Sequence, residues 1–386
     1  MENRDIEYSN YAETSSLGEL AAIFLRLGAT SFGGPLAHIS LMEGEFVERR
    51  KWFSRADFLD MIGVINLVPG PNSSELAMHI GHRRGGVWGL IVAGVAFILP
   101  AVLLVVLLAA FYVSCEKVPQ IQGVLHGLSA VVIAVIAQAW WKFAQAALKN
   151  RLSQIAAVSC LSAMLILKNE IAVLFGAAFF GLMFGAWQNR KDATSSTRRL
   201  PAILVIGGIG WSFATPTLSN IFLIFLKIGA ILYGSGYVLI AFLRDDFVGR
   251  GWITDRQLLD AVAFGQFTPG PLFTTATFIG YILGGVGGAT VATIGIFLPS
   301  FCFVGLVALL LNRFRKSPVL RSFLDCVNAA SLTLMAVVTI QLGASSLLSW
   351  PLIILAALSL ALLLLTKINS VWLLIGGAFL GWALKL

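Results

Sequence analysis

The sequence is poor in charge, cysteine and histidine. Of its 386 residues, 12% are charged, four are cysteine and four are histidine. The cysteines lie far apart, so they lack the paired spacing of a zinc site or a redox dithiol. We therefore expect small apolar packing residues at all four positions, which are Cys115, Cys160, Cys302 and Cys326.

Common catalytic motifs are also missing. The sequence holds no H-E-x-x-H, no G-x-S-x-G and no cluster of cysteine and histidine. An enzyme acting inside a membrane would need a nucleophile with a base, or a set of metal ligands. The sequence thus predicts neither an enzyme nor a bound metal or cofactor.

Apolar residues dominate the chain. They make up 58% of it, and the mean hydropathy is +0.87, which is typical of an integral membrane protein. The formal charge of +8 comes from Lys and Arg in short connections, a pattern of orientation signals that argues against nucleic-acid binding. The polar N-terminus lacks the basic-then-apolar order of a cleavable signal, so we expect the first apolar run to stay in the protein.

One interrupted apolar stretch occurs twice. Residues 58–81 and 258–280 are each broken near the middle by Pro-Gly-Pro, at Pro69-Gly70-Pro71 and Pro269-Gly270-Pro271. Proline in a helix interior costs about 3 kcal/mol and glycine about 1 relative to alanine, so both stretches are predicted to be broken helices. Paired breaks in corresponding halves of a membrane protein indicate a transporter's binding site.

The apolar runs predict an all-α polytopic membrane protein with twelve or thirteen membrane segments. The first run is interrupted by SFGGP at Ser31 to Pro35, and the polar residues 188–199 are predicted to form a linker. The runs cover roughly residues 17–41, 58–81, 87–111, 121–147, 151–167, 171–187, 200–214, 217–243, 257–280, 285–311, 321–342, 350–366 and 370–384.

The second half repeats the first. FLRLG at 24–28 matches FLKIG at 225–229, and the phrase F-x-LP ending at Pro100 matches F-LP ending at Pro299. We predict two homologous six-segment repeats, residues 1–187 and 217–386, joined by a cytoplasmic linker and an extra crossing within 188–216. An odd extra crossing would invert the second repeat.

Loop charge favours this inversion. The turn 82–84 is basic whereas its counterpart 281–284 is uncharged, and 313–321 is more basic than its counterpart 115–120. By the positive-inside rule, equivalent loops then lie on opposite sides. The mixed-charge loop 43–57 does not fit, so the first hairpin either spans the membrane or is re-entrant.

These motifs together resemble the chromate ion transporter family in its long, two-domain form. The resemblance rests on LGATSFGGPLAHI, EFVERRKW, NLVPGPNSSELAMHIG, GG-x-x-G and F-x-LP, and the second half is similar but weaker. It implies export of chromate across the plasma membrane, driven by the proton or membrane gradient, and chromate resistance. The second half has YGSGY and PGPLFTTA in place of SFGGP and PGPNSSEL, so we expect unequal contributions from the two halves.

A tetrahedral dianion such as chromate needs several donors and a positive potential, which the N-terminus of a half-helix provides. Small polar residues follow each break, and an alternative role for them is helix capping or close packing. The expected substrate-binding residues at the breaks are Pro69, Gly70, Pro71, Asn72, Ser73, Ser74, Pro269, Gly270, Pro271, Thr274 and Thr275, together with Ser31, Gly33, Gly34 and His38.

Charged residues within apolar runs form a second group of candidates. Arg26 and Lys227 occupy equivalent positions and are expected to attract the anion, or else to reach an interface or pair with Asp60 or Asp260. Asp60, Asp260 and Glu75 are candidates for proton coupling, although Glu75 could instead interact with a helix dipole.

The partners implied are chromate and membrane lipids, with a homodimer as one form of assembly and no nucleic acid. The competing function is transport or exchange of sulfate or another tetrahedral oxyanion, because sulfate has the same shape and charge as chromate. A purely structural scaffold would not need matched breaks and buried charges.

Overall fold

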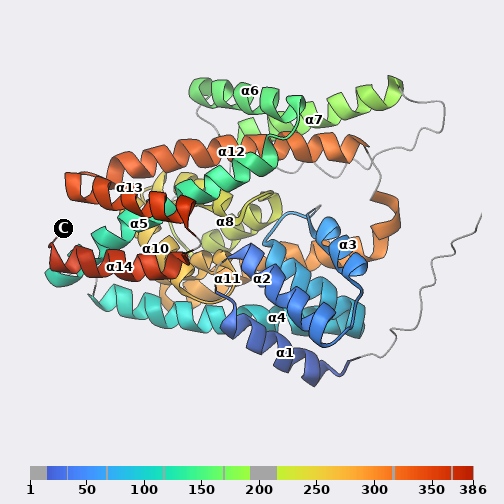
Figure 1. The fold of residues 1–386 in the computed structure, drawn as a ribbon, viewed down its shortest axis with the longest axis horizontal. Coiled ribbons are helices and arrows are strands. Elements are labelled where there is room, and N and C mark those ends of the chain that lie inside the picture. Colours follow the sequence, from blue (N-terminus) through green and yellow to red (C-terminus); the bar gives the residue numbers. More distant parts are fainter. Residues whose placement is uncertain are drawn as a thin grey trace, which may run out of the picture.

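The computed structural model describes residues 15–32, 34–66, 68–115, 118–167, 170–191, 215–314, 318–366 and 368–385, and all regular structure in these ranges is helical. The first half holds α1 (Leu17–Thr30), α2 (Pro35–Glu43), α3 (Arg55–Ile65), α4 (Asn72–Cys115), α5 (Pro119–Ala147), α6 (Arg151–Leu167) and α7 (Glu170–Lys191). The second half holds α8 (Leu218–Ile231), α9 (Leu239–Leu243), α10 (Asp255–Phe267), α11 (Thr275–Phe314), α12 (Pro318–Ser346), α13 (Trp350–Leu365) and α14 (Ser370–Ala383) (Figure 1).

The two halves share one order of elements. In each half a 14-residue helix ends at a break, a short helix passes into a π-helical turn, and a further short helix ends at Pro-Gly-Pro. The π-helical turns are η1 (Gly44–Arg49) and η3 (Arg244–Val248). Two single-turn helices complete the second half, η2 (Gly236–Val238) and η4 (Leu272–Thr274). The predicted repeat is therefore visible in the helices.

The helix that follows each Pro-Gly-Pro folds back on itself. In α4 the reversal lies at Gly85–Gly86 and in α11 at Gly284–Gly285. Gly86 has φ 61° and Gly285 has φ 58°, a left-handed conformation that favours glycine. A side-chain carbon at Gly81 would collide with the carbonyl of Gly89, so the two arms cross in close contact.

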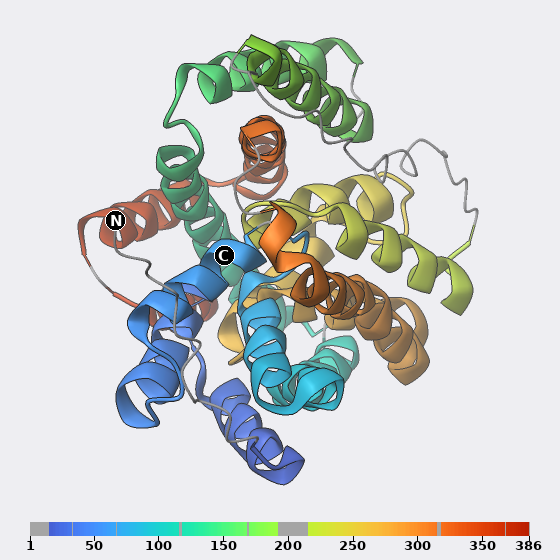
Figure 2. The same cartoon turned by 90° about the vertical axis from the view of Figure 1, so that its right-hand side faces the viewer.

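The halves are interlocked rather than side by side. α5 packs against α13 and α14 of the second half, while α12 of the second half packs against α6 and α7 (Figure 1). Small residues allow these approaches: a side-chain carbon at Gly127 of α5 would collide with the carbonyl of Gly377 in α14. The end-on view in Figure 2 separates the α6–α7 pair, at the top, from α1 at the bottom. Each half thus completes the core of the other.

Four helices in the described ranges are long and apolar enough to cross a membrane, and they correspond to α4, α5, α11 and α12. Several predicted segments prove to be shorter. The run 217–243 is divided into α8 and α9 by a break after Ile231, and α3 has 11 residues, about 17 Å at 1.5 Å per residue. Such short helices cannot each span the roughly 30 Å of a bilayer core, because the breaks end them early.

The connection between the halves is only partly described. The linker was predicted from residue 188, but α7 continues to Lys191 because the chain stays helical through its polar end. The predicted extra crossing at 200–214 lies outside the described residues. The inversion of the second repeat therefore stays a prediction.

Candidate functional site

Two backbone hydrogen bonds join the breaks of opposite halves. The amide of Gly70 donates to the carbonyl of Leu232 over 2.9 Å, and the amide of Gly270 donates to the carbonyl of Ser31 over 2.8 Å. Leu232 and Ser31 are the C-caps of α8 and α1. Each Pro-Gly-Pro is therefore held by the end of the first described helix of the other half, and the four interruptions are joined in two pairs.

Both central glycines need their left-handed backbone. Gly70 has φ 138° and Gly270 has φ 107°, conformations that other residues rarely adopt. A side-chain carbon at Gly70 would collide with the Ser300 hydroxyl and the Glu75 carboxylate, whereas one at Gly270 would meet the methyl of Ala101. The first break therefore adjoins polar groups, and the second adjoins an apolar one.

The polar groups at the first break are buried and unsatisfied. Ser74, Glu75 and Ser300 have no exposed surface, and neither their hydroxyls nor either carboxylate oxygen has a hydrogen-bond partner within the described residues. The Ser300 hydroxyl is close enough to Glu75 for a weak hydrogen-bonding interaction that falls short of standard geometry, and Tyr233 lies near enough to interact with Glu75 electrostatically. Leaving a buried polar group unsatisfied costs about 1–3 kcal/mol, so three together at one helix start indicate a site built for a ligand.

The hydroxyls at the second break are satisfied locally. Thr268 donates to the carbonyl of Gly265 over 3.1 Å, Thr274 to Pro271 over 2.9 Å and Thr275 to Leu272 over 2.8 Å. The hydroxyl protons of the two predicted donors, Thr274 and Thr275, therefore serve their own helix start. Such bonds from a hydroxyl to a carbonyl three residues earlier satisfy the donor within its own turn of the chain.

The remaining polar candidates near the first break have structural contacts as well. The Asn72 amide donates to Asn66 Oδ1 over 2.8 Å and links α4 to the C-cap of α3. Ser73 is buried beside it, with 2% of its surface exposed. Within the described part of the cluster, Ser74 is the residue whose buried hydroxyl lacks a hydrogen-bond partner.

The break after α1 contains Ser31, whose carbonyl accepts the crossing hydrogen bond from Gly270. The Ser31 hydroxyl donates to the carbonyl of Leu27 over 2.6 Å, and His38 Nε2 lies 3.1 Å from the carbonyl of Ser31. A carbonyl only accepts, so Nε2 carries the proton, and this carbonyl also receives the amide of Gly270. Gly34 begins α2 with φ 82°, and Gly33 lies outside the described residues.

The two cations predicted to attract the anion are engaged by carboxylates. Arg26 pairs with Glu45 at 2.7 Å, and Lys227 pairs with Asp246 at 2.6 Å. Glu45 and Asp246 lie in η1 and η3 and are buried, with 7% and 3% exposed. The same pairing in both halves points to a structural role, and the matching positions of the two carboxylates in the repeat were the signal that the sequence analysis missed.

Further cations surround Glu45. Arg49 lies 3.1 Å and Arg50 lies 2.7 Å from its carboxylate. Burial alone would raise the pKa of Glu45, but hydrogen bonds from Arg50 and Arg49 and the charge of Arg26 hold it below its ordinary value. Glu45 therefore stays ionised and holds the π-helical turn against α1.

The three coupling candidates lie in different surroundings. Asp60 is exposed on α3, whereas its counterpart Asp260 is fully buried on α10 and accepts a hydrogen bond of 2.9 Å from the Tyr112 hydroxyl. Of the three, Glu75 is the one whose carboxylate adjoins a Pro-Gly-Pro break. Its neighbours Ser300 and Tyr233 were not among the predicted site residues. The sequence nevertheless held a signal for both, because Ser300 directly follows the F-LP motif and Tyr233 is the first residue of YGSGY.

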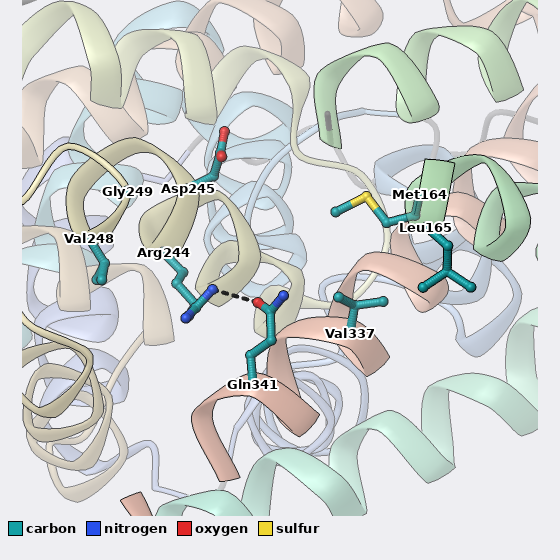
Figure 3. Close-up of a pocket in the computed structure, with 8 residues that line it drawn as sticks. All are labelled: Met164, Leu165, Arg244, Asp245, Val248, Gly249, Val337 and Gln341. Carbon is teal, nitrogen blue, oxygen red and sulfur yellow. Dashed lines mark hydrogen bonds between the residues drawn. The ribbon is translucent and has the colours of Figure 1, made fainter. Parts of the chain in front are cut away.

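A separate cavity of about 500 Å³ lies between α6, η3 and α12 (Figure 3). The Arg244 guanidinium there donates to Gln341 and also pairs with Asp255 at 2.8 Å. Met164, Leu165 and Val337 supply apolar walls. None of the residues that line this cavity belongs to a Pro-Gly-Pro break, and its guanidinium is already bound by protein partners.

Comparison with known proteins matches this chain to chromate transporters and to uncharacterised transporters. The model of the family described as chromate transporter matches residues 18–182 and 219–382. A chromate transport protein of Cupriavidus metallidurans is 34% identical over 379 residues, which cover 96% of this chain and 93% of that protein. A chromate transport protein of Pseudomonas aeruginosa is 33% identical, covering 85% of this chain and 81% of that protein. No solved structure matches the chain.

Proposed function

Because the chain belongs to the chromate transporter family, we propose that it exports chromate across the plasma membrane and so confers chromate resistance. The observation that carries the proposal is the group of unsatisfied buried polar side chains at the first Pro-Gly-Pro break, Ser74, Glu75 and Ser300. We call these three residues the first-break cluster. Among the described residues, the counterparts at the second break, Thr274, Thr275 and Ala101, form no such group.

The first-break cluster suits a tetrahedral oxyanion. The hydroxyls of Ser74 and Ser300 are donors, and the backbone amides at the start of α4 add further donors and the positive end of the helix dipole. Chromate has four acceptor oxygens that could use them. In this proposal chromate binds between the start of α4 and the arm of α11 that carries Ser300.

Neutral donors rather than free cations would hold the anion. Arg26 and Lys227 are already paired with Glu45 and Asp246. A transported ion must bind well enough to enter its site and weakly enough to leave it. Hydroxyls and amides meet this requirement better than a buried guanidinium, which would form a strong bidentate pair with the oxyanion.

Glu75 is the proposed coupling residue. An ionised carboxylate buried without a cation is costly, and beside chromate it would also repel the dianion. A neutral carboxyl group would instead donate to the anion. We therefore assign a proton to Glu75 while chromate is bound, and this proton can be exchanged with solution when the site opens.

The membrane potential provides a driving force for export. With the cell interior negative, moving each elementary charge outward is worth about 2.3 kcal/mol per 100 mV, and chromate carries two. A proton carried outward on Glu75 together with chromate would offset one of these two charges, so the membrane potential would still favour export, by about half as much. The charge of the substrate thus favours the proposed outward direction of transport.

Expression in a chromate-sensitive cell tests the proposal. Cells carrying the wild-type protein should tolerate more chromate and retain less of it than cells with the Glu75→Gln or Ser300→Ala variants. Thr275→Val is the matched control, because Thr275 is the counterpart of Glu75 and its hydroxyl serves its own backbone. Transport per molecule should therefore be nearly unchanged in that control.

Excess sulfate provides a second arm of the same experiment. Competition by sulfate would show that the site accepts tetrahedral dianions in general. If the wild-type protein moved sulfate but left chromate tolerance and retention unchanged, the chromate proposal would be wrong.

A further inference from the structure

Helix α12 carries polar groups that the first-break cluster does not use. Asn328 and Ser331 are three residues apart, so they lie on one face of the helix. Ser331 has no exposed surface, and its hydroxyl has no hydrogen-bond partner within the described residues. Two polar side chains, one of them completely buried and unsatisfied, therefore share a face of α12.

The chain itself links this face to the first-break cluster. The carbonyl of Leu232 accepts from Gly70, the next residue, Tyr233, lies near Glu75, and the one after that, Gly234, lies against Asn328. A side-chain carbon at Gly234 would lie 3.1 Å from Asn328 Oδ1. Three consecutive residues thus bridge the start of α4 and α12.

The contact with α12 is close and specific. Gly234 has φ 94°, a conformation that favours glycine, and a side chain there would also meet Phe143 of α5. The ring of Tyr233 packs edge-on against Phe323 of α12, with 5.9 Å between ring centroids. The break after α8 therefore packs against α12 close to Asn328.

The matching helix of the first half is less polar at these positions. Ser129 on α5 corresponds to Asn328 and is also buried with an unsatisfied hydroxyl. The counterpart of Ser331, however, is Val132, which is fully buried among apolar residues. The pair of polar side chains thus occurs on α12, the helix against which Tyr233 packs, and not on α5.

We propose that the Asn328 amide and the Ser331 hydroxyl form a second oxyanion-binding station, which receives the anion from the first-break cluster. This inference rests on the proposed function. Both side chains are neutral donors, and passage through successive weak sites is how a pore can bind an ion and still release it. The ligand class is the same tetrahedral oxyanion, for which chromate is the probe.

Initial rates of chromate uptake into proteoliposomes containing the purified full-length protein test the station. Ser331→Ala should raise the half-saturating chromate concentration roughly tenfold, the effect of losing one hydrogen bond to a charged ligand. Asn328→Asp keeps the shape of the side chain but places a carboxylate against the dianion, so uptake should fall further.

Thr333→Val is the matched control on the same helix. The Thr333 hydroxyl is buried too, but it donates to the carbonyls of Ala329, over 3.0 Å, and Ala157, over 3.2 Å. Its loss should lower the amount of folded protein and leave the half-saturating concentration unchanged. A change in affinity at Ser331 alone therefore supports the station.

Unchanged half-saturation and maximal rate in Ser331→Ala would overturn the inference. If Ser300→Ala were still defective in that experiment, the proposed function would stand and only the second station would fall. If the wild-type protein moved no chromate, both would fall. Should Asn328→Asp fail to fold, Ser331→Ala decides alone, because removing an unsatisfied buried hydroxyl does not destabilise a purely structural position.

Discussion

The two Pro-Gly-Pro breaks have the same backbone and different chemistry. Gly70 and Gly270 both have left-handed φ values, and both donate to the helix end of the opposite half. Beside the first lie Glu75 and Ser300, but beside the second the corresponding residues are Thr275 and Ala101. The repeat thus preserves the architecture, and the candidate site arises where polar residues of both halves, Glu75 of α4 and Ser300 of α11, meet beside one of the two breaks.

This difference explains how a symmetric scaffold can hold one substrate. A ligand at the second break would find hydroxyls that already serve their own helix start. A ligand at the first break would satisfy groups that are otherwise unsatisfied. The energetic advantage of the first break is therefore the cost of its unsatisfied groups, about 1–3 kcal/mol for each.

Removing a break should have the largest effect. Pro69→Ala with Pro71→Ala should let the helix continue, because the two prolines that prevent a regular turn are gone. We expect insertion with almost complete loss of chromate transport, measured as flux per molecule in vesicles. Pro269→Ala with Pro271→Ala should be similarly severe, since the breaks are joined reciprocally. Normal flux in the first variant would mean that this break is not part of the site.

Converting the polar break toward its counterpart should have the next largest effect. Ser300→Ala places at this position the side chain that Ala101 has in the other half. It should weaken chromate binding roughly tenfold, as expected for one hydrogen bond to a charged ligand, without affecting folding. Saturation curves for uptake measure this change, with Ala101→Ser as the reciprocal variant. A wild-type curve for Ser300→Ala would show that the asymmetry has no functional role.

Breaking the ion pairs of Arg26 and Lys227 should have a smaller effect. It should lower the amount of protein in the membrane rather than the flux per molecule. Arg26→Gln still leaves the buried Glu45 paired with Arg49 and Arg50, so no buried charge loses its last partner. Lys227→Gln should be more harmful, because Arg250, at 3.5 Å, is then the one ion-pair partner left to the buried Asp246 within the described residues, and breaking a buried pair costs roughly 3–5 kcal/mol. Membrane abundance and flux per molecule separate the two roles. A fall in flux per molecule in Arg26→Gln would instead support the original prediction that Arg26 attracts the anion.

The weakest predicted effect is on acid stability. Because the folded-state pKa of Glu45 lies below its ordinary value of 4.5, its ionised form contributes stability above that pH. This contribution should be lost as the pH falls from 4.5 through the folded-state pKa. Thermal unfolding of the detergent-solubilised protein between pH 6 and about 3 would detect it. Glu45→Gln should lose stability at neutral pH and show a smaller decline in acid.

The helices and breaks could be predicted because their causes are local. Pro69 and Pro71 interrupt a helix whatever surrounds them, and the predicted run 151–167 coincides with α6. The repeat was also readable, since matching motifs keep one spacing along the chain. The short length of α3 could not be predicted, because the apolar run does not show where a broken helix ends before it has crossed the membrane.

Contacts between distant residues were beyond the sequence. Arg26 was expected to face the anion or a carboxylate on α3, but the partner that the fold supplies is Glu45 in a π-helical turn. Ser300 lies 225 residues along the chain from Glu75, and only the interlocking of α4 with α11 brings them together. Such pairs depend on how helices pack, which apolar periodicity does not specify.

The location of bound chromate is the most direct test of the account. Anomalous scattering from chromium in crystals of the protein grown with chromate would place the anion without reference to any variant. We predict that the strongest peak lies at the start of α4, within hydrogen-bonding distance of the Ser74 and Ser300 hydroxyls. A peak at Thr274 and Thr275 of the second break, or beside Arg26, would contradict the assignment of the site to the first break.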